Sequence, residues 1–466
     1  MDEQVEQWAQ ESFGDCVLGD RRRTNRLVRI AAAAASRPAG AVTGAILNAA
    51  EREAAYRFIE SSAISPAAIG AAIFRASARA CASSAQVVVA VDQSTVSVTD
   101  NSGKGFGRTS TSFAQRGRRG CQVMSALALD SEGVTTGLLG QEWRIRSDER
   151  SPGWHSDTRP IDDRESGLWM RSIRSAYEHL KREAPRARAW FQLDRGADAT
   201  HVLAALCKLD ADFTVRSAYD RCLEHRVALR KTLEAEPCLG SVAVSIPVHH
   251  AGPGVPRTRP ATLAIKAKRV TLHQTRSKKE ARKLGALSVT AVHVRELSRG
   301  KHPHVEWYLL TNVDVHSLEQ ALEVVQNYRK RWRVEEFHRA WKSGVCNVED
   351  SQLRSVDALR RWSTILAAVA TRAERLKTQS RLEPDVDATT ELSRDEIDAA
   401  IMLTKTKLHK VGDTLTLHQA VNLVALMGGY TGKSSGGPPG AVVIARGLER
   451  VVIGAQMLLQ IRLRSG

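Results

Sequence analysis

The sequence lacks the cysteine patterns that hold zinc or build a disulfide framework. Among 466 residues there are seven cysteines, with no CxxC pair and no Cys/His spacing typical of a zinc site. These cysteines are Cys16, Cys81, Cys121, Cys207, Cys222, Cys238 and Cys346. Scattered single cysteines are typical of reduced thiols, so we expect a cytoplasmic protein.

Long apolar runs are also missing. No stretch approaches the ~20 residues that a membrane-spanning helix needs. The first residues, MDEQVEQWAQ, are acidic and polar, which is not expected of a signal peptide. A phosphate loop is excluded as well, because in GGYTGKSSGG the first glycine of the GxxxxGK[ST] pattern would fall at Met427.

Acidic residues are outnumbered by basic ones. The chain has 68 Lys and Arg against 51 Asp and Glu, a formal net charge of +17. Arginine side chains form forks that match phosphate oxygens, so a polyanionic partner is the first inference. The alternative is a soluble basic protein without such a partner. The length suggests about three domains.

The N-terminal residues 1–66 have a helical pattern. In GDRRRTNRLVRIAAAAA, Asp20 is placed as an N-cap and a high-propensity alanine run follows the arginines. Arg22, Arg26 and Arg29 recur at helical spacing and form one basic face. Such a face suits a DNA backbone, although it could also be an exposed face without a ligand.

After residue 66 the pattern changes to strands. QVVVAVDQSTVSV is typical of a buried central strand, and we expect that strand to end at Asp92. CQVMSALALD and GVTTGLLGQEWRI predict two more strands, ESGLWMRSIRSAYEHLKREA a helix, and RAWFQLDRGAD a strand ending at Asp194. These runs predict an α/β sheet with its acids at one edge.

Three domains are expected from these patterns. We expect a basic helical domain over residues 1–66 and an α/β domain over residues 67–374, with a β-rich insertion over about 205–315. TQSRLEPDVDATT suggests a linker, so residues 375–466 form a third, mostly helical domain.

The segment YRKRWRVEEFHRAWK, residues 328–342, predicts a helix with an unusual face. At about 100° per residue, Tyr328, Arg331, Glu335 and Lys342 fall within roughly 60° of one another. A solvated face laced with ion pairs is one interpretation. Trp332 and Trp341 lie off this stripe, and we expect both in the core.

Two strand-end aspartates and a helical glutamate suit two-metal phosphoryl transfer. Carboxylates are hard oxygen ligands that can hold two Mg²⁺ or Mn²⁺ ions about 4 Å apart. Asp92, Asp194 and Glu335 would be the ligands, with Arg331 and Lys342 beside them to hold phosphates. The shared face of Tyr328, Arg331, Glu335 and Lys342 is therefore better explained as one side of an active site than as a solvated face with ion pairs.

The motifs of this chain resemble those of a known family. It is similar to Tn-five-type transposases, in the insertion-sequence-four group of DDE transposases. Residues Tyr328, Arg331, Glu335 and Lys342 match that group's Y-x2-R-x3-E-x6-K signature. VDQST at Asp92 and LDRGAD at Asp194 resemble the other two carboxylate motifs.

The resemblance implies an RNase H-like catalytic core over residues 67–374 with a β-rich insertion. It also implies an N-terminal helical DNA-binding domain over residues 1–66 and a C-terminal, mostly helical dimerisation region over residues 375–466. It also implies a cut-and-paste transposase that uses two Mg²⁺ or Mn²⁺ ions. Such an enzyme binds double-stranded DNA at the transposon's inverted ends and cleaves both strands through a hairpin. It then joins the ends to target DNA, and it acts as a homodimer. The resemblance also implies a bacterial protein in the cytoplasm, which lies on the nucleoid when it is bound to DNA.

Charge and resemblance imply DNA contacts for Tyr328, Arg331 and Lys342, and for residues outside that helix. Trp307 could stack on a flipped base or pack in the core, and Arg216 could contact a phosphate or be a solvated strand charge. The remaining expected contacts are Arg22, Arg23, Arg26 and Arg57. Two rivals stay open: a domesticated, non-cleaving DNA-binding protein, which would usually lose a carboxylate, and a structure-selective metal nuclease on the same fold.

Overall fold

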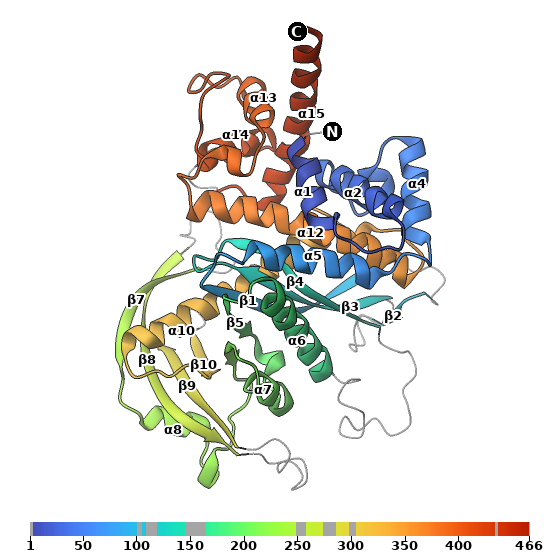
Figure 1. The fold of residues 1–466 in the computed structure, drawn as a ribbon. Helices are drawn as coiled ribbons and strands as arrows, with labels where there is room; N and C mark the ends of the chain where they lie inside the picture. The colour runs from blue at the N-terminus through green and yellow to red at the C-terminus, as the bar shows by residue number, and fades with distance from the viewer. Residues whose placement is uncertain are drawn as a thin grey trace.

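One large mixed sheet runs through the middle of the protein (Figure 1). The computed structural model describes residues 3–99, 105–108, 119–145, 165–247, 258–273, 286–297, 304–433 and 437–465. Within these residues the sheet has 10 strands, in the order β2-β3-β1-β5-β6-β10-β9-β8-β7, with β4 paired to β3. The strands are β1 (Gln86–Val98), β2 (Gly107–Arg108), β3 (Arg119–Leu129), β4 (Thr135–Arg144), β5 (Arg188–Leu193), β6 (Asp212–Arg216), β7 (Gly240–Pro247), β8 (Thr258–Leu272), β9 (Leu287–Glu296) and β10 (Glu306–Thr311). The expected mixed α/β class is confirmed.

The central strands β1, β5 and β6 run parallel, and the others pair antiparallel. The apolar run Val87–Val91 is fully buried because both faces of β1 are covered. The expectation that this strand ends at Asp92 is wrong. β1 continues to Val98, since β3 pairs with it along its whole length from Val88 onward.

Helices cover both faces of the sheet (Figure 1). On one face lie α5 (Pro66–Ala80), α11 (Trp332–Arg339) and α12 (Val356–Leu382), which share one apolar cluster with β1, β3 and β4. On the other lie α6 (Glu165–Glu183), α7 (Thr200–Leu206) and α8 (Leu229–Ala235). The helix α10 (Leu318–Lys330) packs on β5 and β8 to β10.

The N-terminal region is helical, as expected. Its helices are α1 (Glu3–Phe13), α2 (Arg21–Ser36), α3 (Val42–Ala45) and α4 (Ala49–Glu60). The predicted N-cap is confirmed, because the Asp20 carboxylate accepts a hydrogen bond from the Arg22 amide at 2.8 Å. Arg361 of α12 donates to the carbonyls of Ile59 and Ile64, which ties these helices to the rest of the protein.

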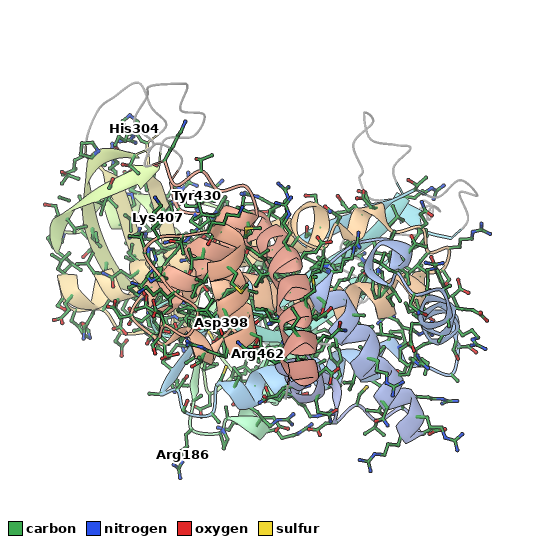
Figure 2. All side chains as sticks on the ribbon, turned by 90° about the horizontal axis from the view of Figure 1, so that it is seen from above. Arg186, His304, Asp398, Lys407, Tyr430 and Arg462 are labelled. Atoms are coloured by element: carbon green, nitrogen blue, oxygen red, sulfur yellow. The ribbon has the colours of Figure 1, made fainter. Side chains whose placement is uncertain are left out.

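α12 crosses the boundary that the sequence suggested near residue 375. It is continuous over 27 residues to Leu382, so the first residues of TQSRLEPDVDATT are helical. The helices α13 (Arg394–Thr404), α14 (Leu417–Met427) and α15 (Ala441–Ser465) follow and share their own apolar cluster. Arg462 near the end of α15 pairs with Asp398 of α13 at 3.0 Å (Figure 2).

The strands of the segment 205–315 belong to the same large sheet. Its first strand, β6, pairs in parallel with β5, and β7 to β9 extend the same sheet beyond β10. The basic stretch TRSKKEARK lies outside the described residues. None of the helices that the structure describes is long and apolar enough to span a membrane. All seven cysteines are free thiols.

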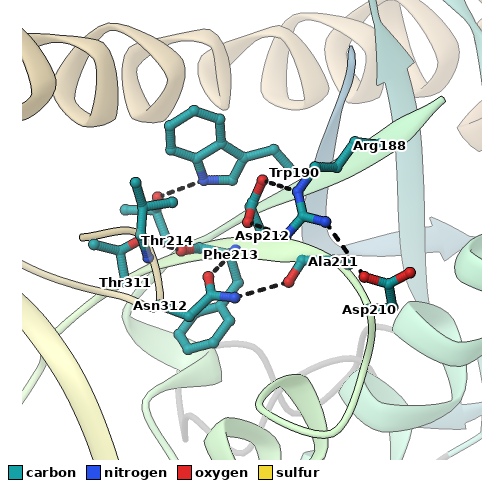
Figure 3. Close-up of polar contacts among 10 residues, drawn as sticks. Arg188, Trp190, Asp210, Ala211, Asp212, Phe213, Thr214, Thr311 and Asn312 are labelled. Carbon is teal, nitrogen blue, oxygen red and sulfur yellow. Dashed lines mark hydrogen bonds and ion pairs between the residues drawn. The ribbon is translucent and has the colours of Figure 1, made fainter. Parts of the chain in front are cut away.

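A polar network fixes the order of the central strands (Figure 3). Arg188 at the start of β5 donates to both carboxylate oxygens of Asp212 at the start of β6, at 2.6 and 2.7 Å. Asn312, just after β10, accepts from the Phe213 amide and donates to the Ala211 carbonyl, both at 2.8 Å. The arginine contact joins β5, which leads into Asp194, to β6, and the asparagine contacts join the end of β10 to β6.

Candidate active site

Asp92 and Asp194 lie side by side on neighbouring strands. The parallel ladder between β1 and β5 ends with the pair Val91 and Leu193, so the two aspartates are the next residues on each strand. Asp92 accepts from the Gln93 amide, and Asp194 from the Gly196 amide, both at 2.8 Å. The β-sheet therefore brings together two carboxylates that are far apart in the sequence.

Glu335 reaches this pair from α11, with Arg331 between them. Arg331 Nη1 lies 3.2 Å from Asp92 Oδ2, and Nη2 lies 2.5 Å from Glu335 Oε1. The side chains of Arg331 and Asp92 are each 13% exposed and that of Glu335 is 31% exposed. One guanidinium fork thus joins a strand carboxylate to a helix carboxylate in a mostly buried site.

The adjacent Glu336 has a different environment. It accepts from Arg333 at 2.8 Å and pairs with Lys377 of α12 at 3.4 Å. Of the two neighbouring glutamates, only Glu335 pairs with the arginine that also binds Asp92. Glu335 therefore belongs to the candidate site, whereas Glu336 joins α11 to α12.

The field at the site raises the pKa of Asp92 to about 7. Burial is the largest cause, the Arg331 guanidinium opposes it, and the nearby carboxylates of Asp194 and Glu335 raise the pKa further. Three acids therefore share one field that a single arginine does not fully neutralise. Such a field favours a bound cation.

The oxygen donors fit a hard divalent cation. Mg²⁺ and Mn²⁺ prefer carboxylate oxygens, and the residual negative charge at Asp92 is what such an ion would compensate. In the part of the chain that the structure describes, no three acidic, histidine or cysteine side chains are gathered closely enough to form a metal cluster. Arg331 lies between Asp92 and Glu335 instead.

Two aromatic rings and a second arginine extend the site. Trp307 of β10 packs edge-on against Tyr328 of α10, with ring centroids 5.4 Å apart. The Cζ atom of Arg216 lies 5.9 Å from the Trp307 ring, and that of Arg331 lies 6.0 Å from the Tyr328 ring. Burial lowers the pKa of Arg216. These four predicted residues are brought together with the carboxylates.

Lys342 is placed differently from the expected stripe. The helix widens into a π-helical turn over Ala340–Gly344, which shifts Lys342 from its regular angular position. Its ammonium lies 3.6 Å from Glu349, whose carboxylate also accepts from the Ser97 amide of β1. Sequence reasoning missed Glu349, for which the only signal was an acid shortly after the signature.

The two tryptophans of the signature have opposite environments. Trp341 is fully buried and donates to the Ser363 carbonyl at 2.9 Å, as expected of a core residue. The expectation that Trp332 is also in the core is wrong, because its side chain is 47% exposed. It begins α11 on the side away from the apolar cluster that buries Val334 and Phe337.

The N-terminal arginines lie on α2 and α4, and part of their charge is used within the fold. Arg26 pairs with Glu51 at 2.5 Å, which joins α2 to α4. Arg57 lies 3.8 Å from Glu53, and Arg23 donates to the Leu18 carbonyl at 3.0 Å. Arg22 is exposed. Their contacts with DNA stay a prediction.

Two family models match the chain. Residues 5–64 match the transposase DNA-binding family, and residues 163–372 match the transposase DDE domain family. These two stretches are thus similar to a transposase DNA-binding domain and to a transposase DDE domain. A DDE domain implies an RNase H-like core, which agrees with the central order β4-β3-β1-β5-β6.

A solved structure was also found to be similar. It is described as the cryo-EM structure of piggyBac transposase synaptic complex with hairpin DNA, with 11% sequence identity and a TM-score of 0.32. The match covers 80% of this chain and 66% of that chain, so the chain spans just under two thirds of that protein's length. A likeness this weak supports no statement about the activity of this protein.

The DDE domain match contains Asp194 and Glu335 but not Asp92. In the structure, β1 places Asp92 next to Asp194, and its carboxylate lies 3.2 Å from Arg331. The transposase DNA-binding match contains Arg22, Arg23, Arg26 and Arg57.

Proposed function

We propose that the protein is a cut-and-paste DNA transposase of the Tn-five-like, insertion-sequence-four group. The observation that carries this proposal is the arginine fork that joins Asp92 to Glu335 beside Asp194. The spacing of Tyr328, Arg331, Glu335 and Lys342 supports the assignment to this group.

In this proposal Asp92, Asp194 and Glu335 hold two Mg²⁺ or Mn²⁺ ions. When bound, the ions activate the attacking water or hydroxyl and stabilise the leaving oxygen. Arg331 keeps Asp92 and Glu335 close together before the ions bind, and then has a guanidinium free for a phosphate of the DNA. Arg216 and Lys342 supply further positive charge for the strand.

The proposed reaction cleaves both strands at each transposon end through a hairpin and joins the free ends to target DNA. A hairpin requires one base near its tip to leave the stack, and Trp307 beside Tyr328 offers an aromatic face for it. The arginines of α2 and α4 bind the transposon end. In this proposal the first nick depends on the three carboxylates, whereas formation of the hairpin also depends on the Trp307 ring.

We propose further that two copies act together and meet through their C-terminal helices. Exposed apolar side chains recur on α15 at Ile453, Met457 and Ile461, which are 55%, 61% and 59% exposed. Their spacing places them on one face of the helix. α15 extends well beyond the body of the protein (Figure 1), where this face is accessible to a second copy.

The direct test uses DNA that flanks the coding sequence. Candidate inverted repeats are placed on a linear duplex and incubated with the full chain in Mg²⁺ or in EDTA. Nicked, hairpin and blunt products in Mg²⁺ alone are expected. Binding without cleavage in both Mg²⁺ and Mn²⁺ would favour the non-cleaving DNA-binding protein, and cleavage that ignores the repeats would favour the nuclease.

A further inference from the structure

Exposed aromatic rings are rare in the part of the protein that the structure describes. Among the residues that the structure describes, only two aromatic side chains are exposed: Tyr219, at 66%, and Trp332, at 47%. Trp332 directly follows Arg331, and Tyr219 lies three residues after Arg216. Both therefore lie close in the sequence to arginines of the candidate active site.

The backbone around Tyr219 is held by a buried carboxylate. Asp198 has a fully buried side chain, and its Oδ2 accepts from the amides of Ala218 and Tyr219 at 2.7 and 3.3 Å. Its Oδ1 accepts from Arg221 Nε at 2.7 Å. A buried carboxylate is costly unless donors surround it, and here most of them come from this one turn.

The turn is also fixed to the strands and helices on either side. The Ser217 amide donates to the Tyr308 carbonyl of β10 at 2.7 Å, one residue after Trp307. Asp220 Oδ1 accepts from the Arg230 amide of α8 at 2.9 Å. Asp198 itself lies four residues after Asp194, so the turn and the catalytic aspartate are held by the same short loop.

We propose that Tyr219 is a nucleobase contact, which stacks on an unpaired base of the DNA strand that enters the active site. Asp198 is the positioning residue that holds the turn in place. This inference rests on the proposed function, since it takes DNA as the substrate.

An unpaired base fits the observations better than a phosphate does. The exposed phenol offers an aromatic face and no positive charge, while Arg216 supplies charge close by in the sequence. Aromatic rings beside arginines form stacking platforms for single strands, because every base has a face to stack. Tyr219 is also distinct from Trp307, which is partly buried and packs edge-on against Tyr328.

The test compares two DNA probes with the full chain in Ca²⁺, which limits cleavage. One probe is a blunt duplex, and the other is the same duplex with a tail of five thymidines, in which 2-aminopurine replaces one base. Tyr219→Ala should lower affinity for the tailed duplex roughly 5- to 150-fold, the usual range for losing one stacked base, and much more than for the blunt duplex. Tyr219→Phe should bind the tail like the wild type.

Quenching of the 2-aminopurine fluorescence reports stacking directly. Wild type and Tyr219→Phe should quench it, and Tyr219→Ala should not. Asp198→Asn should remain folded and lose the same quenching, because Arg221 and the turn amides then meet a neutral acceptor. Leu408→Ala, which removes a side chain that is 85% exposed in the C-terminal region, is the matched control and should behave like the wild type.

Four results would overturn the inference. Equal loss of affinity for both probes in Tyr219→Ala would mean that the ring does not contact the tail. A Tyr219→Phe protein as weak as Tyr219→Ala would mean that the hydroxyl, and not the ring, makes the contact. If the wild type binds neither probe, the proposed function fails as well, whereas binding of both without any effect of Tyr219 overturns the inference alone.

Discussion

Arg331 and Asp92 are 239 residues apart in the sequence, yet Nη1 of one lies 3.2 Å from Oδ2 of the other. The same guanidinium binds Glu335 one turn further along the helix. Because the pair is mostly buried, its charges are weakly screened and fix where α11 lies over β1. The arginine thus holds together two of the carboxylates to which we assign the proposed reaction.

Replacing any one of Asp92, Asp194 or Glu335 by Ala should abolish strand cleavage while leaving end binding largely intact. Each side chain supplies oxygens to the shared ions, and losing that stabilisation should slow cleavage on the order of 100-fold or more. A gel-shift assay in Ca²⁺ measures binding, and product gels in Mg²⁺ measure cleavage.

Glu336→Gln is the matched control for this series. It changes the neighbouring glutamate, which pairs with Arg333 and Lys377 and not with Arg331. Its cleavage rate per folded molecule should stay near that of the wild type. If Glu335→Ala still cleaves, or if Glu336→Gln is the inactive one, the assignment of the site glutamate is wrong.

The buried Asp92 should make stability depend on pH in the absence of metal. Its pKa is about 7 in the folded protein and near 3.9 in an unfolded chain. Between these values the folded state keeps a proton that the unfolded state releases, so stability falls as pH rises from about 4 to 7 and stays lower above 7. The loss should be on the order of a few kcal/mol.

Thermal unfolding in EDTA at pH 5 and pH 8 measures this effect. Asp92→Asn cannot ionise, so relative to the wild type it should be more stable at pH 8 than at pH 5. Mg²⁺ should raise the melting temperature of the wild type at pH 8 by binding the folded state, and should do so much less for Asp92→Asn. An identical pH dependence in both proteins would contradict the electrostatic picture of the site.

Charged residues on the exposed face of α15 should prevent pairing of two DNA ends. Changing Ile453 and Met457 to Asp places two like charges on each copy where an apolar contact is proposed. Single-end binding should remain, and the paired complex should disappear from a native gel. Val17→Asp, at a residue that is 80% exposed, is the control and should still form the paired complex.

Truncation near residue 370 is a poorer test of the same idea. It would cut α12 before Lys377 and so remove one of the two cations that pair with Glu336, the residue next to the site glutamate. If the α15 double variant still pairs two ends, the C-terminal contact is wrong.

Local patterns predicted the elements better than their boundaries. The valine run of β1 and the alanine-rich α2 were correct, because burial and propensity act over a few residues. The end of β1 was not, since pairing with β3 carries the strand past Asp92 and only the tertiary structure decides that pairing. The exposure of Trp332 and the π turn at Lys342 depend likewise on how α11 packs.

The candidate site was predictable as a set of residues but not as an arrangement. Spacing placed Arg331 and Glu335 on one helical face, and the strand patterns suggested that Asp92 and Asp194 lie at one edge of the sheet. Nothing in the sequence showed that Arg331 would bind Asp92 itself, because that contact depends on where the helix docks. The buried Asp198 was missed for the same reason, since its donors come from a distant turn.

Trp307 should matter for the hairpin and not for the first nick. Extruding a base costs a few kcal/mol, and stacking it on an aromatic face returns about 1–3 kcal/mol. Trp307→Ala should therefore nick at a near-normal rate and slow hairpin formation or resolution by roughly 5- to 150-fold.

Because Trp307 also packs against Tyr328, Trp307→Phe is the variant that separates stacking from packing. It retains an aromatic face and should recover most of the hairpin rate. Gels that resolve nicked, hairpin and blunt products over time follow all three steps. Equal slowing of every step in Trp307→Ala, with no recovery in Trp307→Phe, would mean that this tryptophan serves only to pack β10 against α10.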